Sequence, residues 1–129
     1  MKTKPIQQGN AVCWFEIYVQ NMTRAKRFYE AVFRRKLQKL NSPTLVMWAF
    51  PMALDQFGTG GALVRMKGFR SGGNSTLVYF ACKDCAVEAA RAVKNGGKIE
   101  KPKMSIGEYG FIALVYDTEG NMIGLHSLK

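Results

Sequence analysis

The stretch "WFEIYVQNMTRAKRFYEAVF" (14–33) decides the fold, because it changes from a strand pattern to a helix pattern within a few residues. Its first part is rich in aromatic and β-branched residues, so we expect a strand over 12–19. A strand places alternate side chains on opposite faces. One face is wholly apolar and consists of Phe15, Ile17 and Val19. The other face is amphipathic and consists of Trp14, Glu16 and Tyr18.

The second part of the stretch predicts an amphipathic helix. Asn21 is a typical N-cap, since its side chain accepts a hydrogen bond from a free backbone N–H group. Apolar residues then recur at the spacing of one helix face. They are Ala25, Phe28, Tyr29 and Val32. This face is suited to cover the apolar side of the preceding strand.

The same strand–cap–helix pattern returns about half a chain later. "STLVYFAC" (75–82) predicts a strand, Asp84 a cap, and "CAVEAARAVK" (85–94) a helix that stops at the following Asn-Gly-Gly. Three strands follow each helix, at about 36–41, 44–51 and 60–66, and at about 98–102, 109–116 and 121–128. Patterns repeated at this scale decide a fold.

We therefore predict an α+β fold of two βαβββ modules, whose curved mixed or antiparallel sheets surround a cleft with the helices outside. The chain forms one domain over 1–129, with module one at about 10–67 and module two at about 75–129. The polar segment "GFRSGGNS" (68–75) is expected to be a flexible linker between the modules, or a lid over the cleft.

Composition narrows the class of protein. The chain has 129 residues, 47% of them hydrophobic, and a net charge of +10. It contains no apolar run of the ~20 residues that a membrane span needs, and no secretion signal. The positive charges are spread along the chain and no nucleic-acid motif accompanies them. We expect a soluble cytoplasmic protein with a basic surface that binds neither nucleic acid nor membrane.

The three cysteines do not form a disulfide framework, because their number is odd and a cytoplasmic chain keeps its thiols reduced. Cys82 and Cys85 form a C-x-x-C pair at the start of the second helix. A redox role is one interpretation. The stronger interpretation is that the spacing is accidental, since no second pair completes a zinc site.

Two blocks of sequence resemble the vicinal oxygen chelate superfamily of glyoxalases, bleomycin resistance proteins and extradiol dioxygenases. They are "VQNMTRAKRFYEAVF" (19–33) and "GGKIEKPK…GEYGFIALVYDTEGNMIGLHS" (96–127). The chain looks most like the small single-domain glyoxalase-like members, which commonly form homodimers. The resemblance also implies a divalent metal held by His, Glu or Gln from four inner strand positions.

Carried onto this sequence, three of those metal positions fall on Trp14, Leu77 and Gly124, and the fourth lies on the strand "GGALVRM" (60–66). None of these side chains can bind a divalent cation. We therefore expect no metal or other cofactor. The alternative is a relocated site that uses Glu16 and His126, which supply only two ligands where a firm site needs three or four.

The expected cleft is aromatic and apolar with a few polar groups, as small-molecule sites usually are. We predict that the ligand-binding residues are Trp14, Glu16, Tyr18, Arg65, Leu77, Tyr79, Met122 and His126, with Gly124 on the same face and Arg70 at the mouth. Glu16 is the candidate catalytic residue, because burial among aromatic rings would raise its pKa toward neutrality. The alternatives are that Glu16 pairs with Arg65, and that His126 is a structural residue.

Two functions remain open. The first is a binding protein for a small molecule, aromatic or anionic, that lacks the superfamily metal. The second is an enzyme of the same superfamily, a metal-dependent lyase, isomerase or dioxygenase that uses Glu16 and His126. The arginines at the cleft mouth favour an anionic ligand in either case.

Overall fold

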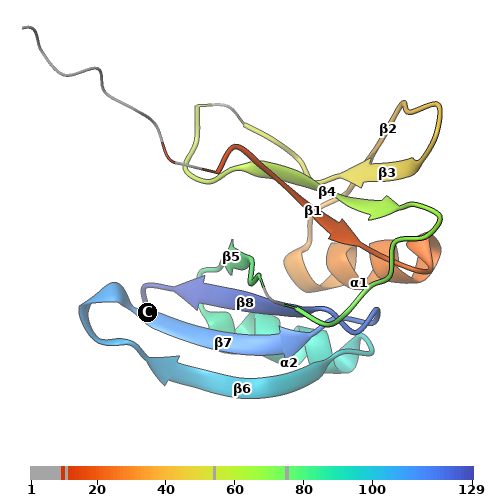
Figure 1. Ribbon diagram of the computed structural model, residues 1–129. Helices are drawn as coiled ribbons and strands as arrows, with labels where there is room; N and C mark the ends of the chain where they lie inside the picture. The colour runs from red at the N-terminus through yellow and green to blue at the C-terminus, as the bar shows by residue number, and fades with distance from the viewer. Residues whose placement is uncertain (1–9, 11, 54, 75) are drawn as a thin grey trace, which may run out of the picture.

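The computed structural model describes residues 10, 12–53, 55–74 and 76–129. Module one contains β1 (Trp14–Tyr18), α1 (Met22–Phe33), β2 (Gln38–Leu40), β3 (Val46–Ala49) and β4 (Gly60–Arg65). Module two contains β5 (Tyr79–Ala81), α2 (Cys85–Lys94), β6 (Lys98–Ser105), the 3-10 helix η1 (Gly107–Tyr109), β7 (Phe111–Tyr116) and β8 (Met122–Ser127). The predicted βαβββ repeat is confirmed (Figure 1).

Each module forms one four-stranded sheet, and the two sheets have the same topology. The strand orders are β1-β4-β3-β2 and β5-β8-β7-β6. In each sheet the first strand of the module pairs in parallel with the last, and the remaining pairs are antiparallel. The predicted α+β class with mixed sheets is therefore confirmed.

Both predicted helix caps are present. The Asn21 side chain accepts a hydrogen bond from the backbone N–H of Arg24 at 2.9 Å, and Asp84 accepts one from Ala86 at 3.1 Å. These bonds satisfy backbone donors that have no partner inside a helix. Within the described residues, neither helix is long and apolar enough to cross a membrane.

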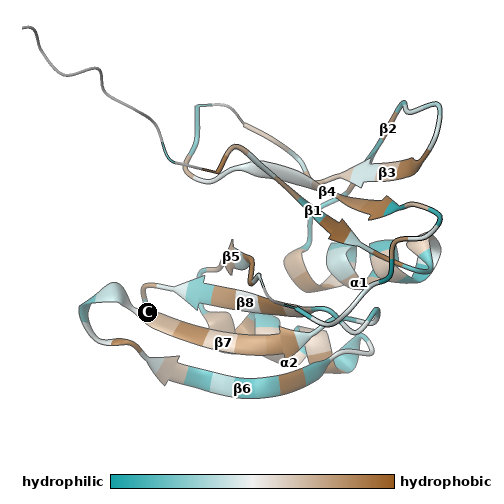
Figure 2. Cartoon of the chain, in the orientation of Figure 1, coloured by the Kyte–Doolittle hydropathy of each residue, from teal (hydrophilic) through white to brown (hydrophobic). Residues whose placement is uncertain are grey.

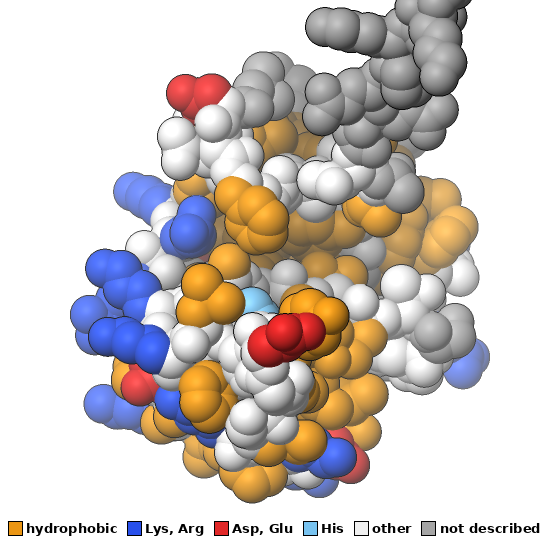
Figure 3. All heavy atoms as spheres, turned by 90° about the vertical axis from the view of Figure 1, so that its left-hand side faces the viewer, with side chains coloured by type: hydrophobic (Ala, Val, Ile, Leu, Met, Phe, Trp, Pro, Cys, Tyr) orange, Lys and Arg blue, Asp and Glu red, His pale blue; other side chains and the backbone are white. Residues whose placement is uncertain are grey.

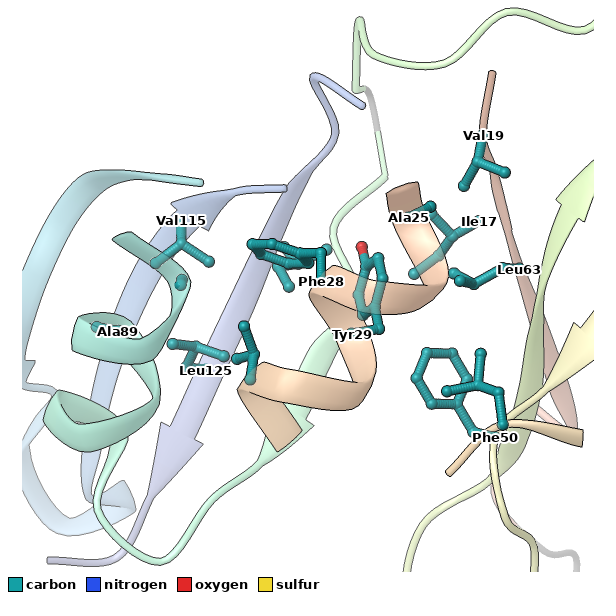
Figure 4. Close-up of a cluster of buried hydrophobic side chains, with 14 of the residues drawn as sticks. Ile17, Val19, Ala25, Phe28, Tyr29, Phe50, Leu63, Ala89, Val115 and Leu125 are labelled. Carbon is teal, nitrogen blue, oxygen red and sulfur yellow. The ribbon is translucent and has the colours of Figure 1, made fainter. Parts of the chain in front are cut away.

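One hydrophobic core joins the two modules (Figure 4). The predicted stripe of α1 is wholly buried and comprises Ala25, Phe28, Tyr29 and Val32. Ile17 and Leu63 pack on one side of α1, and Val115 and Leu125 lie on the other. The rings of Phe15 on β1 and Phe80 on β5 meet edge to face with centroids 5.8 Å apart, so the first strands of the two modules lie close together.

Most strands are shorter than the sequence predicted: β2 and β3 each lose residues at both ends, and Tyr109, predicted to begin a strand, lies in η1. β5 covers Tyr79–Ala81 rather than 75–82, and Ser75 lies outside the described residues. β6 continues to Ser105, beyond the predicted end at 102, because shifts in its register with β7 accommodate Pro102 at this sheet edge. Figure 2 shows β6 as largely hydrophilic, which suits an outer strand.

The segment between β4 and β5 is held in place by hydrogen bonds, which corrects the expectation of a flexible linker. Ser71 Oγ donates to the carbonyl of Glu119 at 2.7 Å, and the Gly72 N–H donates to Asn121 Oδ1 at 2.6 Å. The Asn74 side chain both donates to and accepts from the backbone of Met122. The segment therefore packs against the turn between β7 and β8.

Candidate functional site

The carboxylate of Glu16 is held by the two aromatic side chains that share its strand face. Trp14 Nε1–H donates to Oε2 at 3.2 Å, and the Tyr18 hydroxyl donates to Oε1 at 2.9 Å. Alternation places the three residues on one face, and the aromatic rings are long enough to reach the carboxylate between them. The hydrogen bond to Glu16 raises the pKa of the Tyr18 phenol above its usual value.

Two expectations about Glu16 are wrong. The residue is exposed, so the burial on which its catalytic role was argued is absent. Arg65 is not its partner, because Arg65 follows Val64 on β4 and so falls on the opposite face of the strand. Arg65 Nε instead donates to the backbone carbonyl of Gln20 at 3.3 Å.

A pocket of about 230 Å³ lies at the seam between the modules. Residues of β1, of the 70–78 segment and of β8 line this seam pocket, among them Glu16, Tyr18, Arg70, Asn74, Asn121 and Met122. The Asn121 amide N–H donates to the carbonyl of Tyr18 at 3.0 Å, and this bond ties the turn before β8 to the end of β1. The seam pocket thus combines a carboxylate, a guanidinium and two amides with apolar side chains such as Ile17 and Ile123.

A second pocket, of about 460 Å³, lies over the inner face of β5, β7 and β8. This apolar pocket is lined by Phe57, Tyr79, Phe80, Ala81, Ile106, Ile112 and His126. Figure 3 shows the single histidine, in pale blue, set back between hydrophobic side chains, with an acidic side chain nearby. The volume of the apolar pocket lies in the range of small-molecule sites.

His126 is oriented by a backbone carbonyl. Its Nε2 lies 2.6 Å from the carbonyl oxygen of Tyr109. Because a carbonyl only accepts hydrogen bonds, Nε2 carries a hydrogen and donates it to Tyr109. His126 is thus a hydrogen-bonded residue that still offers one nitrogen.

Five of the eight predicted ligand-binding residues line one of the two pockets, whereas Trp14, Arg65 and Leu77 line neither. Glu16, Tyr18 and Met122 line the seam pocket, whereas Tyr79 and His126 line the apolar pocket. Trp14 packs against the apolar cluster on the inner face of the first sheet, and half-buried Leu77 precedes β5. The structure therefore does not bring Glu16 and His126 into one pocket.

A buried acidic cluster holds the elements around the seam pocket. The Glu119 side chain is fully buried, and its Oε1 accepts the backbone N–H groups of Gln20 and Asn21 at 3.0 Å each. Arg24 Nε donates to Oε2 at 2.6 Å. Burial alone would raise the pKa of Glu119, but the hydrogen bonds from Arg24 and the two backbone groups outweigh it and lower the pKa to about 2.

Asp117 completes this cluster. The Tyr29 hydroxyl donates to its Oδ2 at 2.7 Å, and the backbone N–H groups of Glu119 and Asn121 donate to its Oδ1 at 2.7 and 2.8 Å. Burial raises the pKa of Asp117 in spite of these bonds. The turn 117–121 is therefore a junction that fixes α1 and both modules.

The C-x-x-C pair lacks the properties of a reactive site. Cys85 is buried, and burial raises the pKa of the half-buried Cys82 thiol to about 12. A reactive cysteine needs the opposite shift, since the thiolate is the nucleophile. The structure favours the interpretation that the spacing is accidental.

Several residues of the two pockets escaped prediction from the sequence. Asn74 was predicted only as part of the linker and Asn121 only as the start of a strand, and nothing in the sequence pattern singled out Phe57. Their positions depend on contacts between segments far apart in the chain. The Asn-Gly-rich composition of the linker and turn is the one signal that they share.

Similar solved structures support the fold. A glyoxylase/bleomycin resistance protein/dioxygenase domain from Frankia sp. EAN1pec is 14% identical and covers 93% of this chain and 98% of its own, with a TM-score of 0.71. The trypanothione-dependent glyoxalase I from Leishmania major is 19% identical, covers 93% and 88%, and has a TM-score of 0.69. A glyoxalase-related enzyme from Fulvimarina pelagi is 17% identical, covers 95% and 88%, and has a TM-score of 0.68.

No protein-family model and no curated protein matches the sequence. At these low identities the structural likeness concerns the fold. The chain has the fold of the glyoxalase, bleomycin resistance and dioxygenase proteins, as the resemblance to the vicinal oxygen chelate superfamily predicted.

The residues at the superfamily's metal positions do not fit a metal. Glu16 and Tyr79 occupy equivalent places on the first strands of the two modules. Tyr79 pairs with Gly124 and Glu16 pairs with Ala62, so Ala62 is the counterpart of Gly124 and the fourth of the superfamily's metal positions. The Tyr79 ring lies against Gly124, where a Cβ atom would come within 2.3 Å of it. Among the described residues, no cluster of three or more His, Cys, Asp or Glu side chains is arranged to hold a metal ion.

Proposed function

We propose that the protein binds a small aromatic molecule in the apolar pocket over β5, β7 and β8, without the divalent metal of the superfamily's enzymes. The observation that carries this proposal is the Tyr79 ring, which covers Gly124 at a metal position and forms a wall of the apolar pocket. An aromatic wall where the superfamily holds a metal ligand favours binding by ring contacts. Such contacts contribute about 0.5–1.5 kcal/mol beyond the burial of area.

The lining of the apolar pocket suits a planar ligand that forms one hydrogen bond. Phe57, Tyr79 and Ile112 supply apolar surface, and the His126 imidazole supplies a polar group that can form a hydrogen bond with a ligand. Small-molecule sites commonly combine an apolar lining with a few fixed polar groups. A hydroxylated aromatic ring meets both requirements.

The metal-dependent enzyme that uses Glu16 and His126 has less support, because these residues line different pockets and provide only two ligands. The homodimer expected from the resemblance stays a prediction. Sedimentation equilibrium of the purified chain tests it, and the mass of a single chain would contradict it.

Calorimetric titration with 1-naphthol tests the proposed binding. We expect one saturable site, and we expect Tyr79→Ala to weaken binding roughly fivefold to tenfold because it removes an aromatic wall. Val93→Ala, at an exposed apolar position of α2 outside this pocket, is the matched control and should bind as the wild type does. Absence of saturable binding, or an equal loss in the two variants, would refute the proposal.

A further inference from the structure

A groove lined by cations lies at the end of β4, next to the seam pocket. It is formed by Val19, Gln20 and the segment Arg65–Arg70, and its volume is about 590 Å³. Arg70 lines both this basic groove and the seam pocket, so the two spaces adjoin. Figure 1 shows the segment leaving β4 and running past the turn between β7 and β8.

Three cations of the basic groove are available to a ligand. Arg65, Lys67 and Arg70 are all exposed. The ion pairs between described residues involve other cations, namely Arg24, Lys26 and Lys103. Arg65 binds a backbone carbonyl through Nε alone, which leaves its other N–H groups as donors.

An aromatic platform stands beside these cations. The ring of Phe69 stacks on the ring of Tyr18 with centroids 5.0 Å apart and planes 21° from parallel. Phe69 is nevertheless 46% exposed, although an aromatic ring gains stability from burial. Tyr18 supports one face of Phe69, and the remaining surface is open to a ligand ring.

The position of Phe69 is fixed by its backbone. Its N–H donates to the carbonyl of Met66 at 3.1 Å, and Gly68 between them has a φ of 88°. This is the conformation that a tight turn with glycine at its third position requires. Gln20 Nε2 also donates to the carbonyl of Phe69 at 3.0 Å. The turn therefore presents the ring and the Lys67 side chain in a defined arrangement.

We propose that the basic groove binds the phosphate or carboxylate group of an aromatic ligand whose ring stacks on Phe69. Guanidinium and ammonium groups recognise both anions through charge-assisted hydrogen bonds. Among the described residues that line the adjoining seam pocket, Glu16 alone carries a carboxylate, and its two oxygens already accept hydrogen bonds from Trp14 and Tyr18. The basic groove shares no lining residue with the apolar pocket, so this second site goes beyond the proposed function.

Calorimetric titrations with 1-naphthyl phosphate, 1-naphthoate, 1-naphthol and inorganic phosphate test the inference. The two aromatic anions should bind roughly tenfold tighter than 1-naphthol. Arg70→Gln and Lys67→Gln should each weaken the anions roughly threefold to fivefold and leave 1-naphthol unchanged, as expected for exposed charges. Phe69→Leu should weaken the aromatic anions without changing the binding of inorganic phosphate.

Lys101→Gln on the outer strand β6 is the matched control for the loss of one positive charge. An equal loss in this control, or equal affinity for 1-naphthol and the two anions, would overturn the inference. Preference for one anion shows which of the two groups the groove takes. If 1-naphthol binds and Tyr79→Ala weakens it while the anions gain nothing, the proposed function stands and the anion inference fails. If the anions bind through Phe69 and Arg70 while Tyr79→Ala has no effect on the binding of 1-naphthol, the proposed aromatic site fails instead.

Discussion

Replacement of Glu119 by glutamine tests the junction that holds the two modules and the seam pocket. The wild-type carboxylate is fully buried and accepts hydrogen bonds from Arg24 and from the backbone of Gln20 and Asn21. An amide keeps the shape of the side chain but loses the charge. The amide also replaces one accepting oxygen by an NH₂ group. That group donates hydrogen bonds and cannot accept those from Arg24 or the backbone N–H groups, which are then left without a partner.

The magnitude follows from the pKa of the carboxyl group. The pKa of Glu119 lies at about 2 instead of the ordinary 4.5. Each pKa unit corresponds to about 1.4 kcal/mol, so the whole displacement sets an upper bound of roughly 3 kcal/mol. Arg24 is 52% exposed, and solvent screening reduces its contribution. We expect Glu119→Gln to lower the free energy of unfolding at neutral pH by about 1.5–3 kcal/mol.

The pH dependence has a definite sign. Because folding lowers the pKa of Glu119, its contribution is complete above pH 4.5 and is lost as the pH falls toward 2. The difference in stability between the wild type and Glu119→Gln should therefore be constant near neutrality and shrink in acid. Urea unfolding followed by tryptophan fluorescence, from neutral pH down to about pH 3, measures this difference.

Glu100→Gln, at an exposed position of β6, provides the matched control and should change stability by less than about 0.5 kcal/mol. The reasoning is refuted if Glu119→Gln destabilises no more than this control. It is also refuted if the difference from the wild type stays unchanged down to pH 3, since the carboxylate would then not be the source of the effect.

Three further predictions follow from other contacts. Tyr29→Phe removes the hydroxyl that donates to buried Asp117 at 2.7 Å, and should lower the free energy of unfolding by about 1.5–3 kcal/mol in urea titrations; a loss below 0.5 kcal/mol would contradict this. Gly124→Ala places a Cβ within 2.3 Å of the Tyr79 ring, so it should lower the free energy of unfolding by about 1–3 kcal/mol and weaken 1-naphthol binding. A variant with unchanged stability and unchanged binding would contradict this. The Cys82 thiol, with a pKa of about 12, should react with iodoacetamide at pH 8 roughly a hundredfold slower than free cysteine, and an equal rate by peptide mass spectrometry would restore a reactive role.

Local patterns in the sequence were sufficient to predict the fold. The period of two in β1 and the helical period in α1 each identify the buried face, because side-chain direction follows from backbone geometry alone. Asn21 and Asp84 mark both helix starts, since the capping bond lies within three residues of the cap. The repetition of this pattern supplied the module order.

Contacts between distant segments could not be predicted in the same way. The Glu16 side chain has aromatic partners two residues away on each side, whereas the charges in the sequence suggested Arg65 as an alternative partner. Thr76 and Leu77 of the predicted strand at 75–82 lie outside β5, next to the point where the Asn74 side chain binds the backbone of Met122. The stacking of Phe69 on Tyr18 depends on the path of the whole 66–70 segment.

The most direct test of metal-independent aromatic binding is calorimetric titration of 1-naphthol into the protein before and after exhaustive treatment with a chelator. We predict the same affinity in both samples, and the same again after a divalent metal is added back, because the Tyr79 ring covers Gly124 where the superfamily places a metal ligand. Binding that disappears on chelation and returns with the metal would contradict this prediction.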